Sequence, residues 1–351
     1  MRLTPSPFRV REGCLLALLA LGAAAATRPR YGGTLRVEIR EALETPDPPT
    51  TGPTLARLTP AFAPAQWDAR HAIYAADDKA PGGRPFLDAV DIQMGRRLPD
   101  QAIDLDIGKA DLVEIDANEP RRNGPAARPR EADRSNKVWS SSPVRLLVLV
   151  FGARIEDPRI SEALALAVDR TAIHNVLLQS QCEISGALLP QWLSGYAFLF
   201  PAVKDVARAR TLLAAVPPAA KTFSLGVPDP AHRRIADRIA LNARDAGLVL
   251  SAAPLNSIAD LRLIEVRIES SDPARALAAL AAALALPEPS RADSPEALFA
   301  AERALLEGFR VIPLFHLPDI YGVHPRVKGA SGITPLGEWR FENLWLEPPR
   351  P

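Results

Sequence analysis

Apolar side chains repeat with a helical period after residue 157. The positions i, i+3, i+4, i+7 and i+8 of one helical face are apolar, namely Ile160, Ala163, Leu164, Ala167 and Val168. Asp157 can cap this predicted helix, which continues toward residue 180, and Pro158 fits its first turn. The nearly continuous apolar run at 144–151 predicts a strand buried on both faces. A buried strand followed by an amphipathic helix indicates an α/β unit.

The rest of the chain repeats these two patterns. Apolar runs and apolar/polar alternation predict further strands, at 34–39, 90–94, 112–115, 223–227, 261–268 and 311–316. Amphipathic stretches with capping residues predict further helices, at 100–107, 205–215, 229–247, 272–287 and 294–308. The segments 44–64 and 118–137 are rich in proline or polar residues and read as connections. The order of elements predicts a mixed α/β fold.

The first 26 residues have the pattern of an export signal. Basic residues begin the segment, and an apolar run at 14–26 follows them. Ala24 and Ala26 fit a cleavage site that makes Thr27 the new N-terminus. The run is shorter than the roughly 20 residues of a typical membrane span. We therefore expect export to the periplasm, and an uncleaved anchor is the alternative.

Length and charge narrow the class of protein further. A chain of 351 residues suggests about two domains. Its formal net charge is +1, and it stays near neutral without the export signal, so there is no global electrostatic case for binding nucleic acid. Beyond the signal, Cys182 is the only cysteine. No intramolecular disulfide is then possible, and Cys182 is expected to be a small buried hydrophobe.

The sequence contains no familiar catalytic or metal-binding motif. Gly-x-Ser-x-Gly, His-Glu-x-x-His and Gly-x-x-x-x-Gly-Lys are all missing, which argues against an enzyme. The five histidines form no short-spaced pair and sit beside no cluster of carboxylates; they are His71, His174, His232, His316 and His324. We therefore predict no cofactor and no metal, although imidazole is a suitable nickel ligand.

Several segments, in order along the chain, carry a family resemblance. They are Tyr-Gly-Gly-Thr-Leu-Arg-Val at 31–37, Gly-Gly-Arg-Pro-Phe-Leu-Asp at 82–88, Gly-Lys-Ala-Asp-Leu-Val at 108–113, Pro-Arg-Ile-Ser-Glu-Ala-Leu-Ala-Leu-Ala-Val-Asp-Arg at 158–170 and Pro-Leu-Gly-Glu-Trp-Arg-Phe-Glu-Asn-Leu-Trp-Leu at 335–346. Together they resemble the bacterial extracellular solute-binding proteins of family 5, the dipeptide, oligopeptide and nickel receptors of ABC importers. The chain departs from that family by lacking most of an extra subdomain near 44–64.

The resemblance implies a type II periplasmic-binding-protein fold with two lobes and a discontinuous first lobe. Lobe 1 would span 27–145 with a return at 318–351, and lobe 2 would span 146–317. The crossing strands, near 146–151 and 315–323, would form the hinge. The implied function is a monomeric receptor that passes a peptide-like solute to ABC permease subunits. A reduced sensory or scaffold protein without transport, or a nickel receptor, is the alternative.

The resemblance also suggests which residues bind the ligand. Glu269 stands where the family carries its amine-binding Asp, whereas Val266 replaces the family's nearby Trp. Trp192, Tyr196 and Phe151 are aromatic residues that could line a cleft between lobes. The competing reading makes Glu269 a solvated loop carboxylate and the three aromatic residues part of the core.

Overall fold

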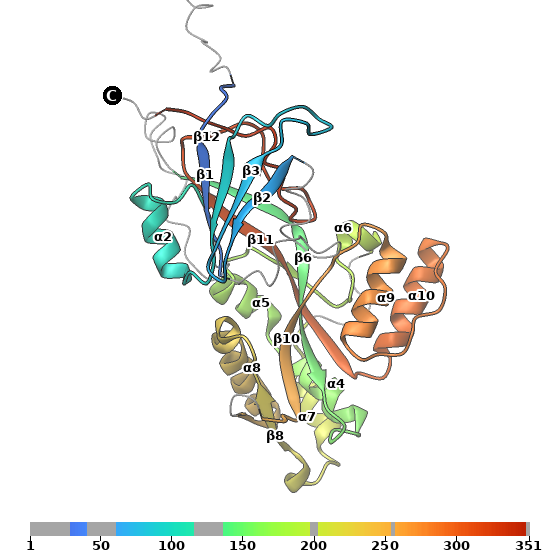
Figure 1. Cartoon of the computed structure of the whole chain (residues 1–351). Coiled ribbons are helices and arrows are strands. Elements are labelled where there is room, and N and C mark those ends of the chain that lie inside the picture. The colour runs from blue at the N-terminus through green and yellow to red at the C-terminus, as the bar shows by residue number, and fades with distance from the viewer. Residues whose placement is uncertain (1–28, 41–60, 116–135, 197–202, 254–256, 349–351) are drawn as a thin grey trace, which may run out of the picture.

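Most of the strands join one mixed sheet. The computed structural model describes residues 29–40, 61–115, 136–196, 203–253 and 257–348. The strand order of the large sheet is β2-β3-β4-β1-β5-β11-β6-β10-β8-β9, with β7 paired to β11 (Figure 1). The predicted export signal and most of the two predicted connections lie outside the described residues.

One end of the sheet is formed by five short strands, shown in blue and cyan in Figure 1. They are β1 (Thr34–Glu38), β2 (Phe62–Trp67), β3 (His71–Ala76), β4 (Ala89–Gln93) and β5 (Leu112–Glu114). β1 runs parallel to β4 and β5, whereas β2, β3 and β4 form an antiparallel meander. The hairpin of β2 and β3 was not predicted, and β2 begins inside the connection expected at 44–64.

Two long antiparallel strands cross the middle of the molecule. β6 (Lys137–Phe151) and β11 (Val311–Val323) pair along nearly their whole length. Both are longer than predicted from the apolar runs at 144–151 and 311–316. In Figure 1 they connect the half that contains β1 to β4 with the half that contains β8 and α4.

The other end of the sheet is formed by β10 (Leu261–Arg267), β8 (Thr222–Gly226) and β9 (Val249–Ala252). β10 lies antiparallel to β6 and parallel to β8. The short β7 (Glu183–Ile184) pairs with β11, and β12 (Val327–Lys328) pairs with β13 (Trp345–Leu346) in a separate small sheet.

The helices are α2 (Leu98–Asp106), α4 (Pro158–Ala167), α5 (Arg170–Ala172), α6 (Gln191–Ser194), α7 (Val206–Leu213), α8 (Arg233–Ala246), α9 (Pro273–Ala283) and α10 (Pro295–Leu306), with the π-helical turn η2 (Ile173–Leu177) and the 3₁₀ turns η3 (Pro218–Ala220) and η4 (Pro230–His232). Four of the helices, α4, α7, α9 and α10, begin directly after the capping residues predicted for them. Among the described residues, no helix is both long and apolar enough to cross a membrane.

The helix predicted after residue 157 does not run on to residue 180. α4 ends at Ala167, because Val168 adopts an extended conformation with φ −67° and ψ 119°. Asp169 then caps α5 by accepting a hydrogen bond of 2.9 Å from the backbone N–H of Ala172. Its own N–H donates to Asn242 on α8. A side-chain cap and a tertiary bond therefore start a second helix within the stretch predicted as one.

The part of β6 from Val144 to Phe151 is largely buried on both faces, as its apolar run predicted. Leu147, Leu149 and Phe151 face the core cluster under α4, α7 and α8. Leu146 and Val148 face a second cluster under α9 and α10. A third cluster packs β1 to β4 against the C-terminal segment that contains Trp339 and Phe341. Each fully buried Leu or Val contributes about 1.5–3 kcal/mol, so β6 is fixed between the two helical layers.

Candidate functional site

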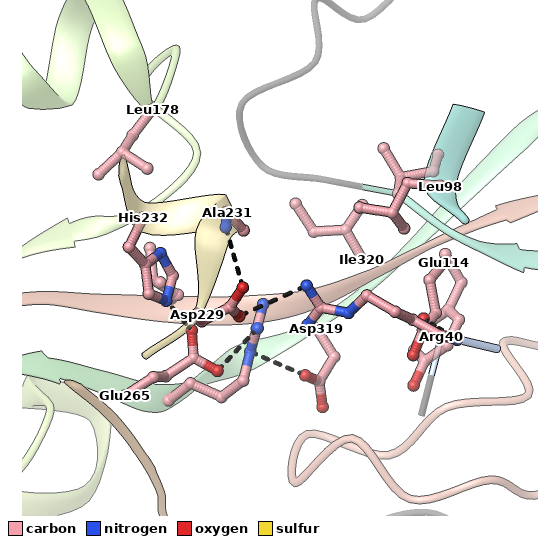
Figure 2. A pocket seen from close by; sticks show the side chains of 14 residues that line it. Arg40, Leu98, Glu114, Leu178, Asp229, Ala231, His232, Glu265, Asp319 and Ile320 are labelled. Carbon is pink, nitrogen blue, oxygen red and sulfur yellow. Dashed lines mark hydrogen bonds and ion pairs between the residues drawn. The ribbon is translucent and has the colours of Figure 1, made fainter. Parts of the chain in front are cut away.

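A pocket lies beside the crossing of β6 and β11 (Figure 2). One wall comes from residues that follow β1 and end β5, and the opposite wall comes from β10 and the η4 turn. The lining residues are Arg40, Leu98, Glu114, Ile115, Arg145, Leu178, Asp229, Ala231, His232, Glu265, Leu317, Asp319, Ile320 and Tyr321. Its volume is about 70 Å³. This is less than half of the roughly 150 Å³ of an engineered cavity that binds benzene.

Arg145 on β6 is the centre of a charged network along the floor of the pocket. Its guanidinium lies 3.0 Å from Glu265 on β10 and 3.0 Å from Asp319 on β11. It also donates a hydrogen bond of 2.7 Å to the backbone oxygen of Pro318. Arg267 holds the other oxygen of Asp319 at 2.7 Å. The network therefore ties together the three strands that pass beneath the pocket.

Irregular pairing brings Asp319 into this position. The register between β11 and β6 shifts on both sides of Pro318. Pro318 has no N–H to donate, and the N–H of Asp319 donates instead to the Ser141 hydroxyl at 2.8 Å. β-Bulges commonly redirect a side chain in this way, and here the result is a carboxylate pointing at Arg145 from a strand that is mostly apolar.

Glu265 carries the most perturbed carboxyl group of the pocket. Burial alone would raise its pKa, but the hydrogen bond with His232 and the charge of Arg145 outweigh burial and lower the pKa to about 2. The His232 Nε2 lies 3.1 Å from the second oxygen of Glu265. Since a carboxylate only accepts hydrogen bonds, Nε2 carries the proton of this bond. Glu265 is therefore ionised and paired on both oxygens.

An ion pair closes the pocket between its two walls. Arg40, two residues beyond β1, lies 3.4 Å from Asp229 at the start of η4. The two residues are 189 positions apart in the sequence. Their side chains are 39% and 36% exposed, so water screens this pair more than the pairs of Arg145 beneath it.

The C-terminal motif supports the network from outside the pocket. Arg267 donates a hydrogen bond of 3.0 Å to the backbone oxygen of Leu336. Gly337 adopts a φ of +79°, and a Cβ at this position would collide with Asp319 and Arg267. Glycine is therefore required here both by its backbone conformation and by the close approach of the ion pair.

None of the four residues proposed from the sequence lines this pocket. Glu269 is exposed and directly follows the buried Ile268, two residues beyond β10. Phe151 is 6% exposed and packs in the core under α4. Their proposed ligand-binding roles remain predictions, and the structure places them at separate points rather than in one site.

Trp192 and Tyr196 lie together at α6, away from the pocket lining. The indole N–H of Trp192 donates a hydrogen bond of 2.8 Å to the backbone oxygen of Pro143. The Tyr196 hydroxyl donates to the buried carboxylate of Glu302 on α10. Both polar groups are therefore engaged by the protein itself, and the aromatic rings attach α6 to its neighbours.

The pocket residues were not predicted, but the sequence contains one signal for two of them, a charged residue inside an apolar run. Arg145 interrupts the apolar run of β6, and Asp319 interrupts that of β11. A charge inside a strand that is buried on both faces requires a partner, so such a residue marks a candidate site. Arg40 and Asp229 gave no comparable signal, because they are far apart in the sequence and come together only in the folded structure.

The histidines are distributed over separate places. Within the described residues, no group of three or more His, Cys, Asp or Glu side chains is arranged to hold a metal ion. His71 pairs with Asp91, and His232 pairs with Glu265. His316 is fully buried against the backbone oxygen of Leu188, and this burial lowers its pKa to about 4.

Comparison with known proteins identifies the architecture. No protein-family profile and no curated protein sequence matches the chain. Among solved structures, an ABC transporter substrate-binding protein from Listeria monocytogenes superposes with a TM-score of 0.65 at 13% identity, over 82% of this chain and 66% of that one. A dipeptide-binding protein from a Pseudoalteromonas species in complex with Met-Leu gives a TM-score of 0.64 at 13% identity, over 82% and 64%.

A solved structure that contains bound nickel has a similar fold. NikA from Staphylococcus aureus in complex with Ni(L-His)₂ gives a TM-score of 0.62 at 14% identity, over 82% of this chain and 68% of that one. The chain thus spans about two thirds of the length of the structures it matches. It has the two-lobed α/β fold of the peptide and nickel substrate-binding proteins of ABC transporters, in a shortened form.

Proposed function

We propose that the protein is an exported solute-binding receptor of an ABC importer, and that it holds a peptide-like solute between two lobes without chemical conversion. Lobe 1 comprises 27–145 with the return at 318–351, and lobe 2 comprises 146–317. The fold shared with peptide and nickel receptors supports this proposal. The solute is passed to permease subunits, and export to the periplasm follows from the signal at 1–26.

The position of the pocket carries the proposal. Arg40 and Glu114 approach it from the proposed lobe 1, whereas Asp229, His232 and Glu265 approach it from the proposed lobe 2. β6 and β11 pass from one lobe to the other directly beneath it. A pocket at the crossing strands is where hinge closure of two lobes would act on a bound solute.

The size of the pocket sets a condition on this function. A volume of about 70 Å³ lies below the roughly 300–1,000 Å³ of typical ligand pockets. A peptide therefore requires the lobes to separate, which breaks the Arg40–Asp229 pair before the solute enters. The bound solute then supplies the contacts that close the lobes again.

A second candidate function is supported by the pairing inside the pocket. Arg145, Glu265 and Asp319 satisfy one another, and the pocket is small. A reduced family member that serves as a sensory or scaffold protein would need no solute. Its pocket would stay closed, with its charged residues paired with one another.

Thermal unfolding with a library of dipeptides and tripeptides tests the receptor function. A ligand that binds only the native state raises the melting temperature, by about 5 °C at 100 times its Kd for a protein of this size. We expect at least one peptide to produce this rise, and nickel chloride serves as the metal arm. If no peptide, no amino acid and no nickel stabilises the protein, the sensory or scaffold function replaces the receptor function.

Glu269 receives a separate test within the same assay. If its carboxylate neutralises the ammonium group of a peptide, Glu269→Gln weakens the peptide that binds by about tenfold or more. Glu288→Gln is the matched control, because it removes another exposed carboxylate from lobe 2. Unchanged affinity of Glu269→Gln by calorimetry removes this residue from the site without affecting the receptor proposal.

A further inference from the structure

We propose that Arg40 and Asp229 are the recognition pair for a small zwitterionic solute of amino-acid size. The carboxylate of the solute takes the place of Asp229 on Arg40, and its ammonium group takes the place of Arg40 on Asp229. This inference rests on the receptor function proposed above and names the solute class of the same pocket. It follows from the hydrogen-bonding capacity of the pocket residues, their charges and the volume between them.

Arg40 has hydrogen-bonding capacity that the described residues do not use. Its backbone N–H donates a hydrogen bond of 2.7 Å to Glu114, which fixes the residue beside β5. Within the described part of the chain, its guanidinium makes one contact, the 3.4 Å approach to Asp229. A guanidinium carries five N–H donors arranged to hold a carboxylate by two parallel bonds. Within the described residues, Arg40 is therefore held in place and keeps N–H donors that could take a second anion.

Asp229 is held at the opposite wall in a similar way. One carboxylate oxygen accepts a hydrogen bond of 2.9 Å from the backbone N–H of Ala231. The other oxygen meets Arg40 at 3.4 Å, which is long for a hydrogen bond between charged groups. An ammonium group at the ordinary 2.7–2.9 Å would bind this oxygen better than Arg40 does.

The other charged groups of the pocket are already committed. Arg145 contacts Glu265, Asp319 and the backbone of Pro318, and Arg267 takes the remaining oxygen of Asp319. Breaking these partly buried pairs would leave charges without partners. The exposed Arg40–Asp229 pair is therefore the one that a solute displaces at least cost.

His232 supplies an independent sign of a missing ligand. The residue lines the pocket and is 6% exposed, and its Nδ1 atom has no hydrogen-bond partner among the described residues. Because Nε2 donates to Glu265, Nδ1 is a lone-pair acceptor in the neutral ring and a second N–H donor in the imidazolium. A buried polar atom without a partner is costly, and the ammonium or the carboxylate group of a zwitterion would satisfy it.

Charge and volume restrict the class of solute. Four carboxylates and two guanidinium groups line the pocket: Glu114, Asp229, Glu265 and Asp319 with Arg40 and Arg145. A simple anion would face the excess of carboxylates. A simple cation would pair with Asp229 but would leave the Arg40 guanidinium without an anion. A zwitterion exchanges one charge for the other and leaves the balance unchanged. The volume of about 70 Å³ favours an amino acid over a peptide.

Calorimetric titration of the full protein with glycine and L-alanine tests the inference. We expect both amino acids to bind, and acetate and methylammonium to bind at least about tenfold more weakly, because each offers one charged group. Arg40→Gln and Asp229→Asn each weaken L-alanine about tenfold or more. His232→Gln keeps an amide near the position of Nε2, loses the polar Nδ1 atom, and also weakens binding.

Arg233→Gln is the matched control, because Arg233 forms an exposed ion pair with Asp237 outside the pocket lining. It should bind L-alanine like the unaltered protein. L-Ala-L-Ala distinguishes a dipeptide from an amino acid. If peptides bind and amino acids do not, or if Arg40→Gln and Asp229→Asn bind as the unaltered protein does, this inference fails and the receptor function stands. If neither amino acids nor the peptide library binds, both fail.

Discussion

Arg145 on β6 and Asp319 on β11 meet at 3.0 Å beneath the pocket, where the two crossing strands lose their regular register. Glu265 on β10 shares the same guanidinium at 3.0 Å. One arginine thus joins three strands at the point that the proposed lobes have in common. Replacing it tests whether this network stabilises the fold.

Arg145→Ala should lower the free energy of unfolding by about 3–5 kcal/mol, because it leaves two partly buried carboxylates without their shared partner. Urea denaturation followed by circular dichroism measures the change. Arg233→Ala removes an exposed arginine from an i,i+4 pair and should cost about 0.5 kcal/mol or less. Equal effects of the two substitutions would show that the network contributes no more than a surface pair.

Glu265 should make stability depend on pH in the acid range. Its pKa in the folded protein, about 2, lies below its ordinary value of 4.5. Its stabilisation is therefore complete above about pH 4.5 and is lost as the pH falls toward 2. The shift corresponds to about 3 kcal/mol, so Glu265→Gln should lose about that much at neutral pH.

The difference between the unaltered protein and Glu265→Gln should shrink steadily between about pH 4.5 and pH 2.5. Urea denaturation at a series of pH values measures it. Asp237→Asn, which removes an exposed carboxylate, should change the free energy little at any of these values. A difference for Glu265→Gln that stays constant down to about pH 2.5 would contradict the lowered pKa.

Local signals in the sequence were sufficient to place several helices. Asp157, Asp272 and Ser294 each precede a proline, and each accepts a hydrogen bond from a backbone N–H of the helix that follows. A cap and its partner lie two or three residues apart, so their meeting needs no tertiary structure. The predicted starts of these helices are confirmed for that reason.

The pocket and the β2–β3 hairpin could not be predicted in the same way. Arg40 and Asp229 meet only after the sheet is assembled, and Asp319 reaches Arg145 through a register shift at Pro318. β2 contains Pro64, and its apolar and polar residues alternate only weakly. The sequence pattern therefore gave little indication of its pairing with β3. Long-range pairing, rather than spacing along the chain, determines these features.

A substitution of Tyr196 can distinguish a structural role of its hydroxyl from a ligand-binding role. Its hydroxyl donates to Glu302, a fully buried carboxylate that also accepts from the backbone of Leu188 and Leu189. Burial raises the pKa of Glu302, so the loss of a donor is costly. Tyr196→Phe should lower the free energy of unfolding by about 1–3 kcal/mol and leave solute affinity unchanged.

Differential scanning fluorimetry measures the stability of Tyr196→Phe, and calorimetry measures its affinity for whichever solute binds. Tyr31→Phe is the control, since Tyr31 is 63% exposed and should tolerate the loss of its hydroxyl. Reduced affinity with unchanged stability would instead support the ligand-binding role first proposed for Tyr196.

Asp111 should be the most sensitive carboxylate outside the pocket. Its side chain is completely buried, and the guanidinium groups of Arg36 and Arg326 both bind it. Burial alone would raise its pKa, but hydrogen bonds from Arg326 and Arg36 outweigh burial and lower it. The carboxylate thus connects β1 to the segment that follows β11, across the first proposed lobe.

Asp111→Asn removes the carboxylate charge that both arginines bind while keeping the size of the side chain. The amide N–H₂ would then face a guanidinium, and the two cations would repel each other. We expect a loss of about 3–5 kcal/mol in urea denaturation at neutral pH. Asp100→Asn, which breaks an exposed pair with Arg97, should lower the free energy of unfolding far less, because water screens this pair. The pKa of Asp111 is lowered, so its contribution to stability is lost only as the pH falls through that lowered value. The difference in unfolding free energy between Asp111→Asn and the unaltered protein should therefore persist at mildly acidic pH. It should disappear in stronger acid.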